Sequence, residues 1–146
     1  MILATLSLEA FVGFAAPAHA MSKCPESVSG AAKQAYPDSK VSSCKLEKAE
    51  GKIQYEVKLV SKSAGKVELD IDSTGSILLT ERIVPADSVA PAVMTAFKAK
   101  YPDSKLDRAE MQTKADGSVD YELAFKVKRK KHEATFRQDG EFVEEE

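Results

Sequence analysis

One pentapeptide occurs twice in this chain, and this repetition constrains the fold more than any other feature of the sequence. Tyr-Pro-Asp-Ser-Lys fills residues 36–40 and again residues 101–105. The similarity extends in both directions, because an alanine-containing segment precedes each copy and a Tyr-Glu pair follows each, at residues 55–56 and 121–122. Self-similarity of this kind indicates repeated structural units. We therefore predict two tandem repeats, over residues 21–82 and 83–146.

Each repeat begins with a predicted amphipathic helix. Apolar residues fall at helical spacing between residues 25 and 36, and again between residues 89 and 101. Pro37 and Pro102 should end these helices, because a residue that precedes proline avoids the helical region of backbone space.

Alternation with period two follows each helix and predicts strands. It is clearest at residues 53–59 and 119–127, and it recurs at 67–71 and 132–136, with Gly-containing turn signals between the runs. A shorter strand before and another after complete each unit. The predicted fold class is α+β, with two tandem repeats, each one helix packed on a four-stranded antiparallel sheet. We expect the two sheets to lie side by side or to form one curved surface, with the face opposite the helices left open to solvent.

The first twenty residues differ from the rest of the chain. An apolar stretch from Ile2 to Ala16, interrupted by Glu9, ends in Pro-Ala-His-Ala. This pattern predicts a signal peptide over residues 1–20, cleaved near Ala20, and hence a periplasmic or secreted protein. A buried N-terminal helix is the alternative. The stretch is too short and too interrupted for stable membrane insertion.

The chain has two cysteines, Cys24 and Cys44. In an oxidising compartment such an isolated pair predicts a disulfide. Closing a loop of about 20 residues would stabilise the fold by roughly 3 kcal/mol. The alternative is a reactive or metal-binding pair of thiols, which would need further ligands. After removal of the leader, His132 is the one histidine that remains.

The segments Ala35–Val41, Gln54–Val57 and Asp70–Ile77 resemble the tandem PepSY-like family, which is grouped with the beta-lactamase-inhibitor-protein fold. The resemblance covers roughly residues 24 to 146. It implies an exported protein that inhibits or restrains envelope enzymes, including proteases, through a concave sheet. Unlike that inhibitor, this chain has no tryptophan, the residue type most enriched at binding hot spots.

No residue pattern in the sequence is typical of catalysis. There is no Gly-rich phosphate loop, no HExxH motif and no CxxC motif. We expect no enzymatic activity, no metal site and no cofactor. The formal charge of -2 also argues against a nucleic-acid partner.

The open face of the sheet is the predicted site of partner binding. By the alternation above, it gathers mixed charges: Glu56, Lys58, Glu68, Asp70, Glu122, Lys126, Glu133 and Arg137. Mixed charges suit either a plain solvated surface or an electrostatically selective interface.

The basic run 126–131 has two interpretations as well. It is either a patch for an acidic partner or a solvated hairpin tip.

The functional hypothesis is an exported, non-catalytic protein that recognises or inhibits a cell-envelope protein through this face. The alternative is a module that senses a small ligand or a metal ion at a site between the repeats. The sequence determines neither the identity of the partner nor the oligomeric state.

Overall fold

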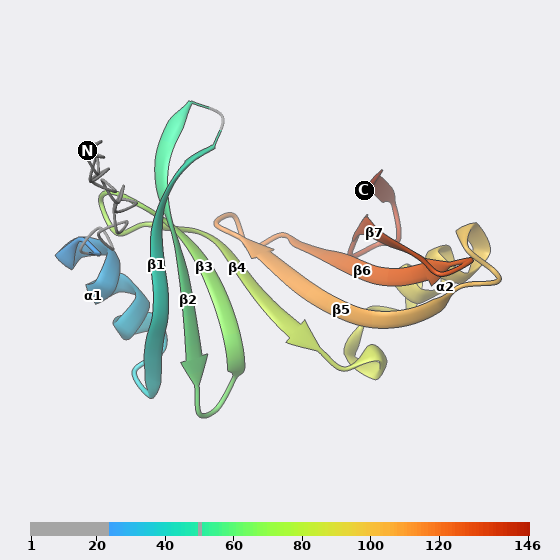
Figure 1. Cartoon of the computed structure of the whole chain (residues 1–146), viewed down its shortest axis with the longest axis horizontal. Coiled ribbons are helices and arrows are strands. Elements are labelled where there is room, and N and C mark those ends of the chain that lie inside the picture. The colour runs from blue at the N-terminus through green and yellow to red at the C-terminus, as the bar shows by residue number, and fades with distance from the viewer. Residues whose placement is uncertain (1–23, 50) are drawn as a thin grey trace, which may run out of the picture.

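A computed structural model describes residues 24–49 and 51–146, so the predicted signal peptide lies outside the described residues. Along the chain the elements are α1 (Glu26–Ala35), β1 (Ser39–Ala49), β2 (Lys52–Ser61), β3 (Gly65–Asp72), β4 (Ile77–Val84), the 3-10 turn η1 (Ala86–Ser88), α2 (Pro91–Lys100), β5 (Lys105–Lys114), β6 (Val119–Val127), β7 (Lys130–Arg137) and β8 (Phe142–Glu145). Each strand pairs with the next one, which makes a single eight-stranded antiparallel sheet (Figure 1).

The two copies of the pentapeptide form matching corners between a helix and a strand. The carbonyl of Tyr36 accepts hydrogen bonds from the backbone N–H and the hydroxyl of Ser39, at 3.1 and 2.6 Å. The carbonyl of Tyr101 accepts the same two bonds from Ser104, at 3.1 and 2.7 Å. Each tyrosine N–H also closes the last turn of its helix. The repeated sequence therefore forms a repeated structure.

Each helix packs on its own strands, so the molecule has two hydrophobic cores. The core beneath α1 consists of Val28, Ala32, Val57, Leu59, Val67, Leu69 and Ile71. The core beneath α2 is more aromatic and consists of Val89, Val93, Phe97, Ala109, Tyr121, Leu123, Phe125, Ala134 and Phe136. Among the described residues, no buried side chain belongs to both cores.

The prediction of a separate four-stranded sheet in each repeat needs one correction, because all eight strands form one continuous sheet, which is the second of the two arrangements expected above. Strand β4 runs through to Val84, past the predicted boundary between residues 82 and 83. It pairs with β5 from Leu79 opposite Lys114 to Val84 opposite Ala109. The division of the chain at residues 82 and 83 stays a prediction.

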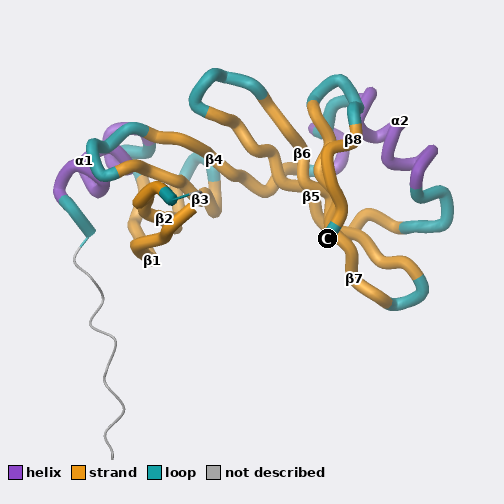
Figure 2. Tube along the Cα trace, turned by 90° about the horizontal axis from the view of Figure 1, so that it is seen from above, coloured by secondary structure: helices purple, strands orange, loops and turns teal. Residues whose placement is uncertain are grey.

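The sheet is curved, and both helices lie on the outer side of the bend. In the view from above, α1 and α2 lie on the same side of the sheet, and the outer strands of each half curve away from them (Figure 2). The face opposite the helices, here called the open face, is therefore the inner surface of the curve.

The disulfide between Cys24 and Cys44 is present, as the sequence predicted. It connects Cys24, which lies just before α1, to Cys44 in the middle of β1. The α1 core is the smaller and less aromatic of the two, so a crosslink worth roughly 3 kcal/mol lies where apolar burial contributes least.

Candidate binding face

The register of the strands places all eight predicted residues on the open face. Glu56 pairs with Asp70 and Lys58 with Glu68 across β2 and β3. On β6, even-numbered positions alternate with the buried Tyr121, Leu123 and Phe125. On β7, odd-numbered positions alternate with the buried Ala134 and Phe136, which places Glu133 and Arg137 on the same side as Glu122 and Lys126. Whether this face binds a partner stays a prediction.

Two of these residues lie far from the centre of the face. Lys126 is near the end of β6, where its Nζ lies 2.8 Å from Asp107 Oδ2. Arg137 forms an ion pair with Glu141 four residues later, at 2.6 Å. The other six form two groups, one on β2 and β3 and one on β6 and β7, and strands β4 and β5 lie between the groups.

Sequence reasoning missed the residues in the middle of the face, which β4 and β5 supply. Glu81 on β4 lies between Glu68 on β3 and Gln112 on β5. Glu110, also on β5, lies opposite Glu122 on β6. The sequence did not predict these positions, because they depend on the pairing of β4 with β5 that joins the two repeats. Periodicity within one strand contains no information on which strands lie beside it.

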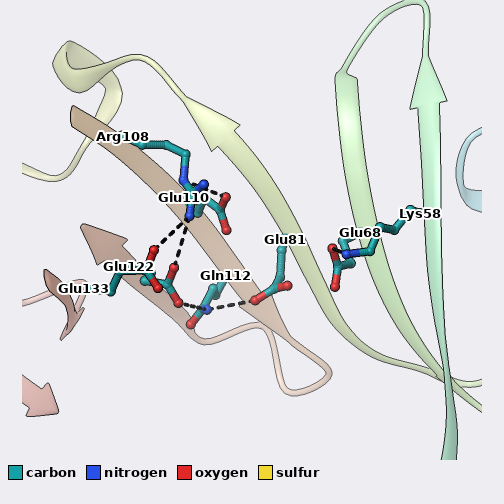
Figure 3. A network of polar contacts seen from close by, with 8 residues as sticks. All are labelled: Lys58, Glu68, Glu81, Arg108, Glu110, Gln112, Glu122 and Glu133. Carbon is teal, nitrogen blue, oxygen red and sulfur yellow. Dashed lines mark hydrogen bonds and ion pairs between the residues drawn. The ribbon is translucent and has the colours of Figure 1, made fainter. Parts of the chain in front are cut away.

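Gln112 and Arg108, both on β5, contact carboxylates on β4, β5, β6 and β7 (Figure 3). The Nε2 of Gln112 donates to Glu81 at 2.8 Å and to Glu122 at 3.4 Å. The guanidinium of Arg108 lies 3.0 Å from Glu110, 3.8 Å from Glu122 and 3.3 Å from Glu133. The guanidinium of Arg108 therefore forms ion pairs with several carboxylates.

Lys58, on β2, contacts the carboxylates of the first half in a similar way. Its Nζ lies 3.0 Å from Glu68 and 3.3 Å from Glu56 (Figure 3). Asp70 accepts a hydrogen bond from Gln54 at 3.0 Å. On both halves the carboxylates outnumber the cations that contact them, so the middle of the open face has an excess of negative charge.

This crowding raises the pKa of the acidic side chains. Burial raises the pKa of Glu81 to about 7. The charges of Glu68, Glu110 and Asp70 contribute to this rise, and the hydrogen bond from Gln112 opposes it. Burial and neighbouring carboxylates also raise the pKa of other acids on this face, namely Glu47, Glu68, Asp70 and Glu122.

A hollow of about 300 Å³ lies on the open face and extends from β1 to β5. Its lining includes the acidic Glu68, Glu81 and Glu110 together with two aliphatic residues, Val60 and Ile83. Val60 is 49% exposed and Ile83 is 52% exposed, and both stand beside charged groups. Lys58, Lys66 and Arg82 line it as well, so the hollow combines apolar surface with charged groups of both signs, and both predicted repeats contribute to it.

Within residues 24–49 and 51–146, no group of three or more His, Cys, Asp or Glu side chains is arranged to hold a metal ion. Neither helix in the described part of the chain has the length and apolar character needed to cross a membrane.

The fold and this face define a class of small α+β proteins made from a duplicated helix-and-sheet unit. The sequence matches the family described as "Putative beta-lactamase-inhibitor-like, PepSY-like" in two segments, residues 18–79 and 78–144. The chain therefore belongs to this PepSY-like family.

Solved structures share the fold across most of the chain. A BLIP-like protein from Bacteroides fragilis has 21% identity and a TM-score of 0.62, and the match covers 84% of this chain and 85% of that chain. A DUF2874 family protein from Bacteroides uniformis has 17% identity and a TM-score of 0.68, with coverage of 84% and 88%.

A third structure, described as "putative periplasmic", comes from Bacteroides eggerthii. It has 16% identity and a TM-score of 0.68, and it covers 84% of this chain and 88% of that chain. At these identities the likeness shows the fold alone. The comparison with curated proteins gave no match.

Proposed function

We propose that this chain is an exported, non-catalytic binding protein that recognises a cell-envelope protein through the open face of its sheet. The observation that supports this most strongly is the hollow at the middle of the face, where exposed Val60 and Ile83 stand beside Glu68, Glu81 and Glu110. Aliphatic side chains surrounded by charged groups are typical of a protein interface with an apolar centre and a polar rim.

The chemistry of the face favours a partner with a basic surface. Carboxylates outnumber cations there, and Glu81 is held partly buried among other acids. A lysine or arginine of the partner would relieve the repulsion among these groups, while its aliphatic stem would cover Val60 and Ile83. Complementary charge of this kind increases the rate of association and selects against acidic partners.

Variants of two exposed isoleucines test this proposal. Ile83→Lys would place a cation and its solvation shell inside the hollow and should abolish capture of the partner. Ile53→Lys is the matched control, because Ile53 is 51% exposed and lies on the other side of the sheet, in register with Lys48. The full chain and both variants would be expressed with export, crosslinked in the envelope and purified, and the captured proteins identified by mass spectrometry.

The expected result is an envelope protein that the wild type and the Ile53 variant both capture and the Ile83 variant does not. Capture that survives in the Ile83 variant, or that disappears equally in both variants, would contradict binding through the open face. Circular dichroism of both variants checks that each one is folded.

A small-ligand function has one observation in its favour. The hollow, at about 300 Å³, lies at the lower end of the volumes typical of ligand pockets, and both predicted repeats line it. A ligand that binds the folded state raises the melting temperature. A thermal-shift screen of basic amino acids, peptides, glycans and divalent metals would show this, and the Ile83→Lys variant should lose any shift that arises in the hollow.

A further inference from the structure

The end of the molecule formed by the β6–β7 hairpin carries a concentration of positive charge that lies away from the hollow on which the proposed function rests. The exposed cations there, here called the basic end, are Lys105, Lys126, Lys128, Arg129, Lys130 and Lys131. They come from the start of β5 and from the hairpin, at the right-hand end of the molecule (Figure 1). Within the described residues, the ion pair of this group is that of Lys126 with Asp107.

Three lysines of the basic end form a row across neighbouring strands. Lys105 pairs with Lys126, and Lys126 pairs with Lys131. Like charges directly opposite each other destabilise a sheet. The fold therefore tolerates a repulsive row at this end.

The turn of the same hairpin is also unfavourable. Val127 pairs with Lys130, so Lys128 and Arg129 are the two loop residues, and both have positive φ, at 47° and 72°. Two-residue hairpins with positive φ at both positions strongly prefer Asn-Gly or Asp-Gly. Every other hairpin of the described sheet places a glycine at positive φ, namely Gly51, Gly65, Gly75, Gly117 and Gly140.

The equivalent hairpin of the first half lacks both features. Between β2 and β3 the loop is longer, because Ser61 pairs with Gly65. Asp38 fastens it by accepting hydrogen bonds from the Ser61 hydroxyl and the Ser63 N–H, both at 2.8 Å. The turn between β6 and β7 is shorter than the one between β2 and β3, and it is strained and cationic. Strain that persists at an exposed position is a reason to seek a function there.

From the lysine row and the strained cationic turn together, we propose that the basic end docks on an anionic phospholipid surface. A protruding hairpin with cations on its turn and on its flanks can contact many headgroups at once. Its cations lie on the turn and on three neighbouring strands, so they are spread over a surface rather than gathered around one small anion, and mobile lipid headgroups can match such a spread. Each Lys or Arg beside an anionic membrane adds to the attraction.

The negative charge of the open face would orient the molecule on the membrane. The acidic middle of the open face would be repelled by the same membrane, so the hairpin would point toward the lipid and the hollow would stay available to a protein partner. This arrangement is compatible with the proposed function but does not depend on it.

A vesicle-binding experiment tests the proposal with the double variant Lys128→Asn/Arg129→Gly. The control is Lys48→Asn/Lys52→Asn, which removes two exposed lysines at the other end of the sheet, near the β1–β2 hairpin. All three proteins are made as the full chain, so the N-terminal segment is identical. Sedimentation with phosphatidylcholine vesicles, with and without 30% phosphatidylglycerol as the chosen probe, gives the partition coefficients.

The expected result separates binding from stability. The hairpin variant should lose roughly thirtyfold in partition to anionic vesicles because it lacks two cations, while its melting temperature rises because Asn-Gly suits the turn. The control should bind like the wild type, and raising the salt concentration should weaken wild-type binding.

Three outcomes would overturn the proposal. The first is equal binding to neutral and anionic vesicles, and the second is undiminished binding by the hairpin variant. The third is binding to soluble polyglutamate, sensitive to the hairpin variant, without any binding to vesicles, which would assign the basic end to an acidic protein instead.

Discussion

At the scale of single residues, Glu81 combines partial burial with close acidic neighbours and a hydrogen bond from Gln112. Its folded-state pKa of about 7 lies above the ordinary value of 4.5, so the folded protein holds this proton more tightly than the unfolded chain does. The resulting stabilisation is complete below pH 4.5 and is lost as the pH rises to about 7. Several other acids of the open face are shifted in the same direction.

The variant Glu81→Gln should therefore stabilise the protein at pH 8, by about 1–2 kcal/mol after allowance for the part of the carboxyl that water still screens. At pH 4 the gain should vanish, because the wild-type side chain is then neutral as well. Urea unfolding followed by circular dichroism between pH 4 and pH 8 measures this. Glu144→Gln removes the same charge from an exposed position and should leave the pH dependence unchanged.

At the scale of elements, a glycine in each half holds a hairpin against a helix. Gly75, between β3 and β4, has φ of 94°, and a Cβ there would lie 2.9 Å from the Ser27 carbonyl oxygen of α1. Gly140, between β7 and β8, has φ of 92°, and a Cβ would lie 2.8 Å from the Ala92 carbonyl oxygen of α2. The duplicated unit thus repeats a backbone contact as well as a sequence motif.

Gly140→Ala should destabilise the protein by about 2–4 kcal/mol, because the methyl group meets both an unfavourable φ and a helix carbonyl. Gly117→Ala is the control, since Gly117 has φ of 83° but no atom within 4 Å of an added Cβ. It should lose only about 1 kcal/mol. Free energies of unfolding from urea titrations give both values, and equal losses would show that the helix contact contributes nothing.

The burial pattern of each strand explains whether the sequence could predict it. Strands β2, β3, β6 and β7 have one buried and one open face, so period-two alternation predicted them and their open-face residues. Strand β4 has intermediate burial along nearly its whole length and gave no such pattern. The register shift between Leu106 and Arg108 interrupts the period-two alternation of β5. For this reason the sequence pattern did not assign Glu110 and Gln112 to the open face.

At the scale of the whole molecule, two cores are joined by one sheet. Within the described residues, the junction is the ladder between β4 and β5, from Leu79–Lys114 to Val84–Ala109. Backbone hydrogen bonds there align the halves, but the large buried side chains of one half do not pack against those of the other. The curvature that forms the hollow therefore depends on a junction with little apolar burial of its own.

This separation of the cores predicts that one half can be destabilised without the other. Replacing both cysteines by alanine removes roughly 3 kcal/mol of loop-closure stabilisation from the half that contains α1. Hydrogen exchange measured by mass spectrometry should show faster exchange in β1–β3, with β6 and β7 unchanged. Phe97→Leu, at the centre of the α2 core, should produce the reverse pattern. If either variant accelerates exchange equally in both halves, the β4–β5 ladder couples them into one cooperative unit, and the hollow is as rigid as the cores themselves.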